Sequence, residues 1–192
     1  MIKAEGIHKT FEDFTALDNI TCNISDGCIY GMVGSNGAGK STFLRVLSGI
    51  YKPDKGCAYI DDEPIYENPK VKDNIVFVSD ELFFLPGATM SKMADFYSSI
   101  YDRFNYDRFL KLAELFELNI KKPIANFSKG MKRQASIILA LSTRAKYMFF
   151  DETFDGLDPV MRNLVKKLIC NDVAEYDTTV IVTSHSLREL ED

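Results

Sequence analysis

The sequence predicts an α/β fold that is built around a phosphate-binding loop. Residues 34–41 read Gly-Ser-Asn-Gly-Ala-Gly-Lys-Ser, which fits the pattern G-x-x-x-x-G-K-[ST] without a mismatch. Three short and wholly apolar runs are typical of strands that are buried in a sheet. These runs cover residues 75–78, 147–150 and 180–182. Residues 90–141 contain no convincing strand, so we expect a helical insert near 85–140.

The composition is that of one globular domain. The chain has 192 residues, of which 46% are hydrophobic and 27% are charged, and its net charge is −5. An acidic chain is a poor default binder of nucleic acid, so we expect no nucleic-acid partner. The four cysteines form no C-x-x-C pair, which argues against a zinc site or a redox motif. No apolar run approaches the roughly 20 residues that a membrane span needs.

The N-terminal part is predicted to form two strands, over residues 2–11 and 16–24, around a polar turn at 12–14. Apolar side chains alternate with polar ones near the end of the second strand, at Ile20, Cys22 and Ile24. This alternation is typical of a half-buried strand.

The phosphate-binding loop has the flanking elements that it needs. Residues 28–33 are short and largely apolar, which indicates a strand, and a helix with apolar residues at helical spacing is predicted from Lys40. Gly49 is expected to end this helix, and a further strand is predicted at 58–60. Between a strand and a helix, the glycines let backbone N–H groups converge on phosphates.

The insert and the end of the chain complete the pattern. Helices are predicted over residues 91–101, 106–117, 129–142 and 160–175. The last of these is amphipathic, with Met161, Leu164, Val165 and Leu168 on one face. We find no internal repeat and no low-complexity tract.

Two carboxylates, Asp151 and Glu152, follow the apolar run at 147–150. Strand ends in open α/β sheets face the ligand crevice. Beside a phosphate-binding loop, Asp151 is suited to the Mg²⁺ shell and Glu152 to polarising a water that attacks the γ-phosphate. In a loop of this kind, the lysine (Lys40) binds the β- and γ-phosphates and the serine hydroxyl (Ser41) binds Mg²⁺. A solvated Asp-Glu turn is the simpler alternative.

Three further positions have two interpretations each. Ser128 and Gly130 begin a predicted helix, so they form either an ordinary helix cap or a second anion site. His185 follows the strand at 180–182 and is either a surface residue or a contact of the γ-phosphate. Phe11 is either a packing aromatic or a face on which a purine stacks.

Taken together, these segments resemble the nucleotide-binding domain of an ATP-binding cassette (ABC) transporter. Residues 34–42 match Walker A, 148–152 match Walker B with its adjacent glutamate, and 155–158 match the D-loop. Residues 127–131, Phe-Ser-Lys-Gly-Met, are similar to the signature LSGGQ, and His185 matches the switch histidine. The match covers nearly the whole chain with its motifs in the family's order.

The resemblance implies a P-loop NTPase (RecA-like) core with a small antiparallel β subdomain and an inserted α-helical subdomain. It divides a single domain, 1–192, into a core of 1–84 and 141–192 and a helical subdomain of 85–140. Because the family normally continues with further strands after the switch histidine, we expect the chain to be truncated at its C-terminus.

The resemblance also implies roles for individual residues. Glu152, His185 and Lys40 would be catalytic. Mg²⁺ would be held by Ser41, Asp151 and Asp80. ATP would be bound by Phe11, Gly34, Ser35, Asn36, Gly37, Ala38, Gly39, Lys40, Ser41 and Thr42. In a head-to-tail dimer, Ser128, Lys129 and Gly130 would contact the ATP of the partner subunit, and Asp158 would line the dimer interface.

Two of these positions depart from the family pattern. Asp80 stands where the family usually has a glutamine that ligates Mg²⁺ and touches the membrane partner, and a carboxylate can still ligate Mg²⁺. Lys129 replaces a glycine of the signature, whose serine and second glycine remain. Both changes resemble bacterial exporter-type cassettes.

The leading hypothesis is an ATP-hydrolysing subunit that uses ATP and Mg²⁺, dimerises with a second cassette, and drives a separate membrane permease from its cytoplasmic face. The alternative is an ABC-type ATPase that acts on ribosomes or DNA, although such proteins usually carry paired cassettes or long coiled coils. A GTPase would need an Asn-Lys-x-Asp motif to recognise guanine, and the sequence lacks one. A kinase would not need Ser128 or His185. A non-catalytic scaffold would not need Lys40 and Glu152 together. The transported molecule and the direction of transport are not encoded in these motifs.

Overall fold

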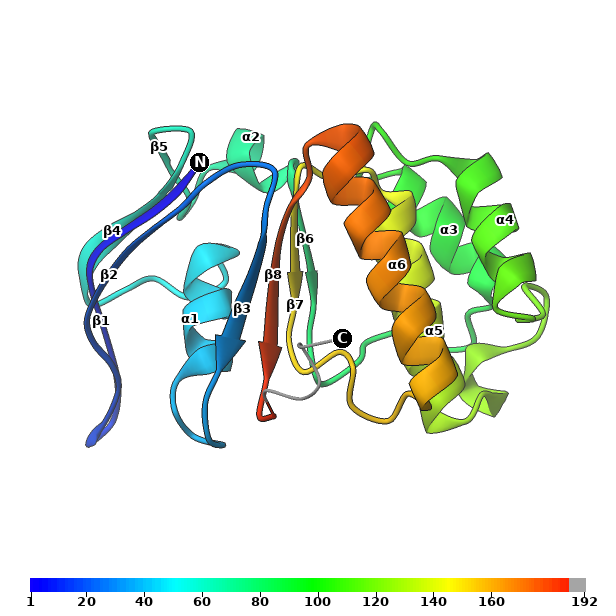
Figure 1. Cartoon of the computed structure of the whole chain (residues 1–192), viewed down its shortest axis with the longest axis horizontal. Helices are drawn as coiled ribbons and strands as arrows, with labels where there is room; N and C mark the ends of the chain where they lie inside the picture. Colours follow the sequence, from blue (N-terminus) through cyan, green and yellow to red (C-terminus); the bar gives the residue numbers. More distant parts are fainter. Residues whose placement is uncertain (187–192) are drawn as a thin grey trace.

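The computed structural model describes residues 1–186 and contains two sheets with helices between and beside them (Figure 1). Part of the predicted core, residues 187–192, lies outside the described residues. The first sheet is antiparallel with the strand order β2-β1-β4-β5, and the second is parallel with the order β3-β8-β7-β6. The predicted α/β class and the antiparallel β subdomain are confirmed.

The antiparallel sheet is formed by β1 (Ile2–Phe11), β2 (Phe14–Ile24), β4 (Lys55–Ile60) and the short β5 (Glu63–Pro64). The second strand begins two residues earlier than predicted, so the turn of the hairpin is confined to residues 12 and 13. Glu12 takes a left-handed backbone with φ 50°, which allows this tight reversal.

The parallel sheet is formed by β3 (Ile29–Val33), β6 (Ile75–Val78), β7 (Tyr147–Phe150) and β8 (Thr179–Ser184). The predicted apolar runs at 147–150 and 180–182 belong to the two inner strands, β7 and β8, and the run at 75–78 is the edge strand β6. All residues of β7 and β8 are buried, because layers of structure cover both faces of the sheet.

Alternate residues of β7 therefore belong to two different hydrophobic cores. Tyr147 and Phe149 pack with the antiparallel sheet and with α1 (Lys40–Leu47), which lies between the two sheets in Figure 1. Met148 and Phe150 pack on the other side, against the remaining long helices. The parallel sheet is the central layer, and both cores are anchored on it.

The remaining long helices cover the second face of the parallel sheet. They are α3 (Met90–Ser98), α4 (Tyr106–Leu115), α5 (Lys129–Ser142) and α6 (Pro159–Tyr176), and Figure 1 shows α3 and α4 outside α5. Each begins at a side chain that accepts a hydrogen bond from the first turn: Thr89, Asn105, Ser128 and Asp158. The predicted helical insert is confirmed, with α3 and α4 each shorter at the C-terminal end than predicted.

Three short elements were not predicted: β5, α2 (Pro69–Lys72) and a 3₁₀ turn at Ile124–Asn126. They are too short to show a hydrophobic period in the sequence. The predicted end of the first helix at Gly49 is confirmed, because this residue takes φ 68° directly after the helix C-cap.

Candidate functional site

The phosphate-binding loop joins β3 to the N-terminus of α1, and its backbone needs glycine. Gly39 has φ 88°, and a Cβ atom there would lie 2.4 Å from the carbonyl oxygen of Ala16, so a side chain at this position would clash with β2. No side chain caps the first turn of α1. The N–H groups of this turn are therefore not occupied by a capping side chain, which suits an anion site at a helix N-terminus.

Lys40 is only 7% exposed, and its ammonium contacts oxygen atoms of the phosphate-binding loop and of Glu152. Nζ donates hydrogen bonds to the carbonyl oxygens of Gly34 at 2.8 Å and Ser35 at 3.1 Å. It also lies 3.3 Å from Oε1 of Glu152. The structure thus brings together the lysine and the glutamate that the sequence predicted to share one phosphate.

Asp151 is fully buried at the end of β7, and one of its oxygens is held by two hydroxyl groups. Oδ1 accepts hydrogen bonds from Ser41 at 2.9 Å and from Thr183 at 2.8 Å. Oδ2 is also buried and has no hydrogen-bond partner among the described residues. A buried carboxylate oxygen of this kind, next to a serine hydroxyl, has the hard oxygen chemistry that Mg²⁺ prefers.

Glu152 is held in an uncommon backbone conformation, with φ 47° in the left-handed region. Its N–H donates a hydrogen bond of 3.0 Å to the Thr183 hydroxyl, so that this residue of β8 holds both the backbone of Glu152 and the carboxylate of Asp151. Nδ1 of His185 lies 3.9 Å from Oε2 of Glu152 and 3.5 Å from Oδ2 of Asp155. The predicted base and the predicted switch histidine are therefore close together.

Of these groups, Lys40, Ser41 and Glu152 line a cavity of about 330 Å³. Its walls are formed by Phe14, Ala16, Asn36, Gly37, Ala38, Gly39, Lys40, Ser41, Thr42, Asp80 and Glu152. Most of the predicted ATP contacts line it. The wall residues as a whole come from β2, the phosphate-binding loop, α1 and the segments that follow β6 and β7.

The aromatic residue at the wall of this cavity is Phe14 and not Phe11. Phe14 is 59% exposed and lies on the β2 side of the cavity. Phe11 packs edge-on against Tyr51, with 5.4 Å between the ring centroids, and Lys9 lies over its ring. Purine stacking on Phe11 stays a prediction, and Phe14 is a second aromatic that the sequence pattern did not single out.

Asp80 lies in the cavity wall but is already engaged by an arginine. Nη2 of Arg133 lies 2.7 Å from Oδ1 of Asp80, and Nη1 donates to the carbonyl oxygen of Ser79 at 3.1 Å. Arg133 had no predicted role, and neither did Thr183. Both residues act through contacts between distant segments, so no local spacing marked them.

The signature residues lie at the start of α5, on the surface. Ser128 is exposed, and its hydroxyl accepts a hydrogen bond of 3.2 Å from the N–H of Met131. A Cβ atom at Gly130 would lie 3.2 Å from the carbonyl oxygen of Gly156, so the signature is packed against the predicted D-loop. Asp158 is exposed and caps α6. Within one chain these serine and aspartate side chains are helix caps, which for Ser128 is the simpler of its two predicted interpretations.

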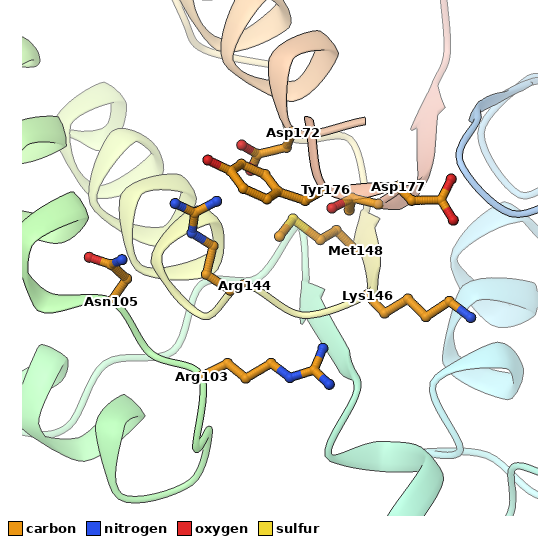
Figure 2. Close-up of a pocket in the computed structure, with 9 residues that line it drawn as sticks. Arg103, Asn105, Arg144, Lys146, Met148, Asp172, Tyr176 and Asp177 are labelled. Atoms are coloured by element: carbon orange, nitrogen blue, oxygen red, sulfur yellow. The ribbon is translucent and has the colours of Figure 1, made fainter. Parts of the chain in front are cut away.

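A second and larger cavity, of about 440 Å³, lies at the opposite end of the parallel sheet. Lys146 and Thr178, which line it, precede β7 and β8, whereas Asp151 and His185 follow these strands. Figure 2 shows Arg144 beside the ring of Tyr176, and the guanidinium carbon lies 3.8 Å from the ring centroid. Burial raises the pKa of the Asp172 carboxyl in its wall, although Arg108 and Arg144 act in the opposite direction. This cavity has no phosphate-binding loop.

Among residues 1–186, none of the helices combines the length and the apolar character that crossing a bilayer requires.

The comparisons with known proteins agree with this geometry. The sequence model of the family described as "ABC transporter" matches residues 17–155. The ABC transporter ATP-binding protein YtrB of Bacillus subtilis (strain 168) is 32% identical over 191 residues, an alignment that covers 100% of this chain and 65% of YtrB. The linearmycin resistance ATP-binding protein LnrL of the same organism is 32% identical over 197 residues, covering 100% of this chain and 63% of LnrL.

The fold is shared with solved ATP-binding cassettes. The dimeric structure of the cassette MJ0796 in a post-hydrolysis state, bound to ADP and Pi, superimposes with a TM-score of 0.87 at 23% identity, covering 98% of this chain and 90% of that one. The chain spans less than two thirds of the length of YtrB and LnrL. Because the family match covers most of the chain and includes its phosphate-binding loop, we conclude that the chain belongs to the ABC transporter family and carries its ATP-binding domain.

Proposed function

We propose that this chain binds and hydrolyses ATP as the subunit that drives a separate transmembrane permease. The observation that carries the proposal is the convergence of four side chains: Lys40, Ser41 and Glu152 line one cavity, and the buried Asp151 contacts Ser41. Lys40 lies 3.3 Å from Glu152, and the Ser41 hydroxyl donates to Asp151 at 2.9 Å. A phosphate-binding lysine, a metal-binding pair and a general base are the parts that a P-loop ATPase requires.

The chemistry follows from these positions. The backbone N–H groups of the phosphate-binding loop and the Lys40 ammonium bind the β- and γ-phosphates. Ser41 and Asp151 would hold Mg²⁺, which would neutralise phosphate charge. Glu152 accepts a proton from the water that attacks the γ-phosphate, while His185 contacts a γ-phosphate oxygen. Asp80 completes the polar wall of the cavity and is a further candidate ligand of Mg²⁺.

Dimerisation completes the site. Ser128, Lys129 and Gly130 occupy the surface-facing N-terminus of α5, where the hydroxyl and the N–H groups of the first turn can meet an anion on a second subunit. Asp158 lies on the same surface, near the contact between Gly130 and Gly156. MJ0796, which shares this fold, is described as a dimer. In this proposal ATP is sandwiched between the phosphate-binding loop of one subunit and Ser128 of the other.

The permease partner is inferred from the relatives. YtrB is named an ABC transporter ATP-binding protein, and LnrL a linearmycin resistance ATP-binding protein. By analogy, this chain would sit at the cytoplasmic face of the membrane through its permease and would belong to an exporter-type system.

Fractionation of cells that express the tagged chain from its own locus tests the permease partner. Recovery of the chain in the membrane fraction, together with a multi-span membrane protein that co-purifies in mild detergent, is the expected result. Co-purification with ribosomes or DNA and no membrane protein would instead favour the alternative ABC-type ATPase. Purified chain that hydrolyses no ATP in the presence of Mg²⁺ would contradict both.

A further inference from the structure

Asp80 and Arg133 form an ion pair in which one side chain is buried and the other is exposed to solvent. The Arg133 side chain is 3% exposed, whereas the Asp80 side chain is 57% exposed and reaches the cavity. The guanidinium makes two directed contacts, one to Asp80 at 2.7 Å and one to the carbonyl oxygen of Ser79 at 3.1 Å. Because a planar guanidinium holds its acceptors in a fixed geometry, these contacts fix the orientation of the Asp80 carboxylate.

The pair connects the cavity to the helix that carries the signature. Asp80 follows β6 and shares the cavity wall with Lys40 and Glu152. Arg133 belongs to α5, whose N-cap is Ser128. A single ion pair therefore joins the nucleotide cavity of one chain to the helix that is proposed to face the second subunit.

The charge balance explains why the two residues occur together. A carboxylate at position 80 adds a negative charge to a cavity that is proposed to bind a triphosphate, and this charge would repel the ligand. The buried guanidinium cancels that charge. In return, Asp80 supplies the counter-charge without which a buried arginine is strongly destabilising.

We propose that Arg133 is a positioning residue for the nucleotide site, which neutralises and orients Asp80 so that this carboxylate lies in the cavity wall without repelling ATP. The inference rests on the proposed function, because it takes ATP to be the ligand of the cavity. It gives a role to an arginine in a helix that does not itself line the site.

A double-mutant cycle tests this role by a measurement that is independent of hydrolysis. ATP affinity is measured by calorimetry in the presence of EDTA for the wild type, Arg133→Gln, Asp80→Asn and the double variant. Arg133→Gln leaves a net negative charge at the cavity and should weaken ATP binding by about tenfold. Asp80→Asn leaves a net positive charge and should bind ATP more tightly than the wild type. The double variant is neutral again and should return to within about twofold of the wild type.

A matched control separates this effect from a change in net charge. Arg103→Gln removes one positive charge at the second cavity, at the opposite end of the parallel sheet (Figure 2), and should leave ATP affinity within about twofold of the wild type. An equal loss of affinity in Arg103→Gln and Arg133→Gln would overturn the inference. So would single variants that shift the affinity in the same direction.

The two possible failures are distinguishable. A wild-type chain that binds no ATP contradicts the proposed function and the inference with it, whereas ATP binding by the wild type without opposite shifts contradicts the inference alone. If Asp80→Asn, which leaves the buried Arg133 guanidinium without its counter-charge, does not fold, thermal unfolding of the double variant decides. The ion pair predicts that removing the charge of Arg133 as well restores folding and ATP binding, and an unfolded double variant would overturn it.

Discussion

Lys40 and Glu152 approach each other across the phosphate-binding cavity, with 3.3 Å between Nζ and Oε1. The lysine is placed by the first turn of α1 and the glutamate by the end of β7, so two elements that are distant in sequence converge on one point. At this separation both groups can reach the same phosphate. The contact also keeps the two charges balanced within a largely buried site.

Lys40→Ala should abolish measurable ATP binding, because the phosphates lose their nearest positive charge and Glu152 is left without its cation. We expect the affinity to fall by about 100-fold or more in a calorimetric titration. Lys92→Ala, which removes an exposed lysine on α3, is the matched control and should bind like the wild type. Unchanged affinity in Lys40→Ala would show that the loop does not bind the triphosphate.

Glu152→Gln should bind ATP but hydrolyse it about 100-fold more slowly or worse, because an amide cannot accept the proton of the attacking water. Phosphate release under single-turnover conditions measures this directly. Glu114→Gln, at an exposed position of α4, carries the same chemical change and should keep wild-type turnover. Normal hydrolysis by Glu152→Gln would assign the base to another residue.

Ser128→Arg should leave ATP binding by the single subunit intact and prevent dimerisation, because a long cation replaces the small hydroxyl on the proposed contact surface. Size-exclusion chromatography in the Glu152→Gln background, with and without ATP, measures the dimer. The lost helix cap costs about 1 kcal/mol, so Ser128→Asn, which keeps a capping side chain, is the control and should still dimerise. An ATP-dependent dimer of Ser128→Arg would place the interface elsewhere.

The sequence predicted those parts of the site that are set by local chemistry. The loop at 34–41 and the carboxylates after β7 carry their signal in consecutive residues. The structure places the loop between β3 and α1 and both carboxylates directly after β7. Thr183 and Arg133 could not be predicted in this way. They act through contacts with Asp151 and Asp80, which depend on the pairing of β7 with β8 and on the packing of α5 against β6.

The aromatic residue that lines the cavity is a second feature that the sequence alone did not predict. The family resemblance implied Phe11 as the stacking residue, whereas Phe14 lines the cavity. The turn between β1 and β2 is one residue tighter than predicted, and which aromatic side chain faces the loop depends on that register. A period-2 pattern fixes which residues share a face of a strand, but it does not fix where the strand ends.

The last prediction concerns an ion pair that joins α4 to α6. Arg108 of α4 pairs with Asp172, which is 1% exposed, and burial raises the pKa of this carboxyl while Arg108 and Arg144 lower it and Glu175 raises it. Arg108→Met keeps the length and the packing of the side chain but removes its charge. The pKa of Asp172 in the folded chain should then rise further above its unfolded value of about 3.9.

The sign of the pH dependence follows from that shift. Over the range between the two pKa values the folded chain binds more protons than the unfolded chain, so the free energy of unfolding of Arg108→Met should fall as the pH rises. We expect the variant to lose about 3 kcal/mol relative to the wild type at pH 8, and about 1 kcal/mol less than that near pH 5. Urea titrations at both pH values measure the difference. Adding Asp172→Asn should remove the pH dependence of the loss, and an equal loss at both pH values in Arg108→Met alone would show that Arg108 acts through packing and not through its charge.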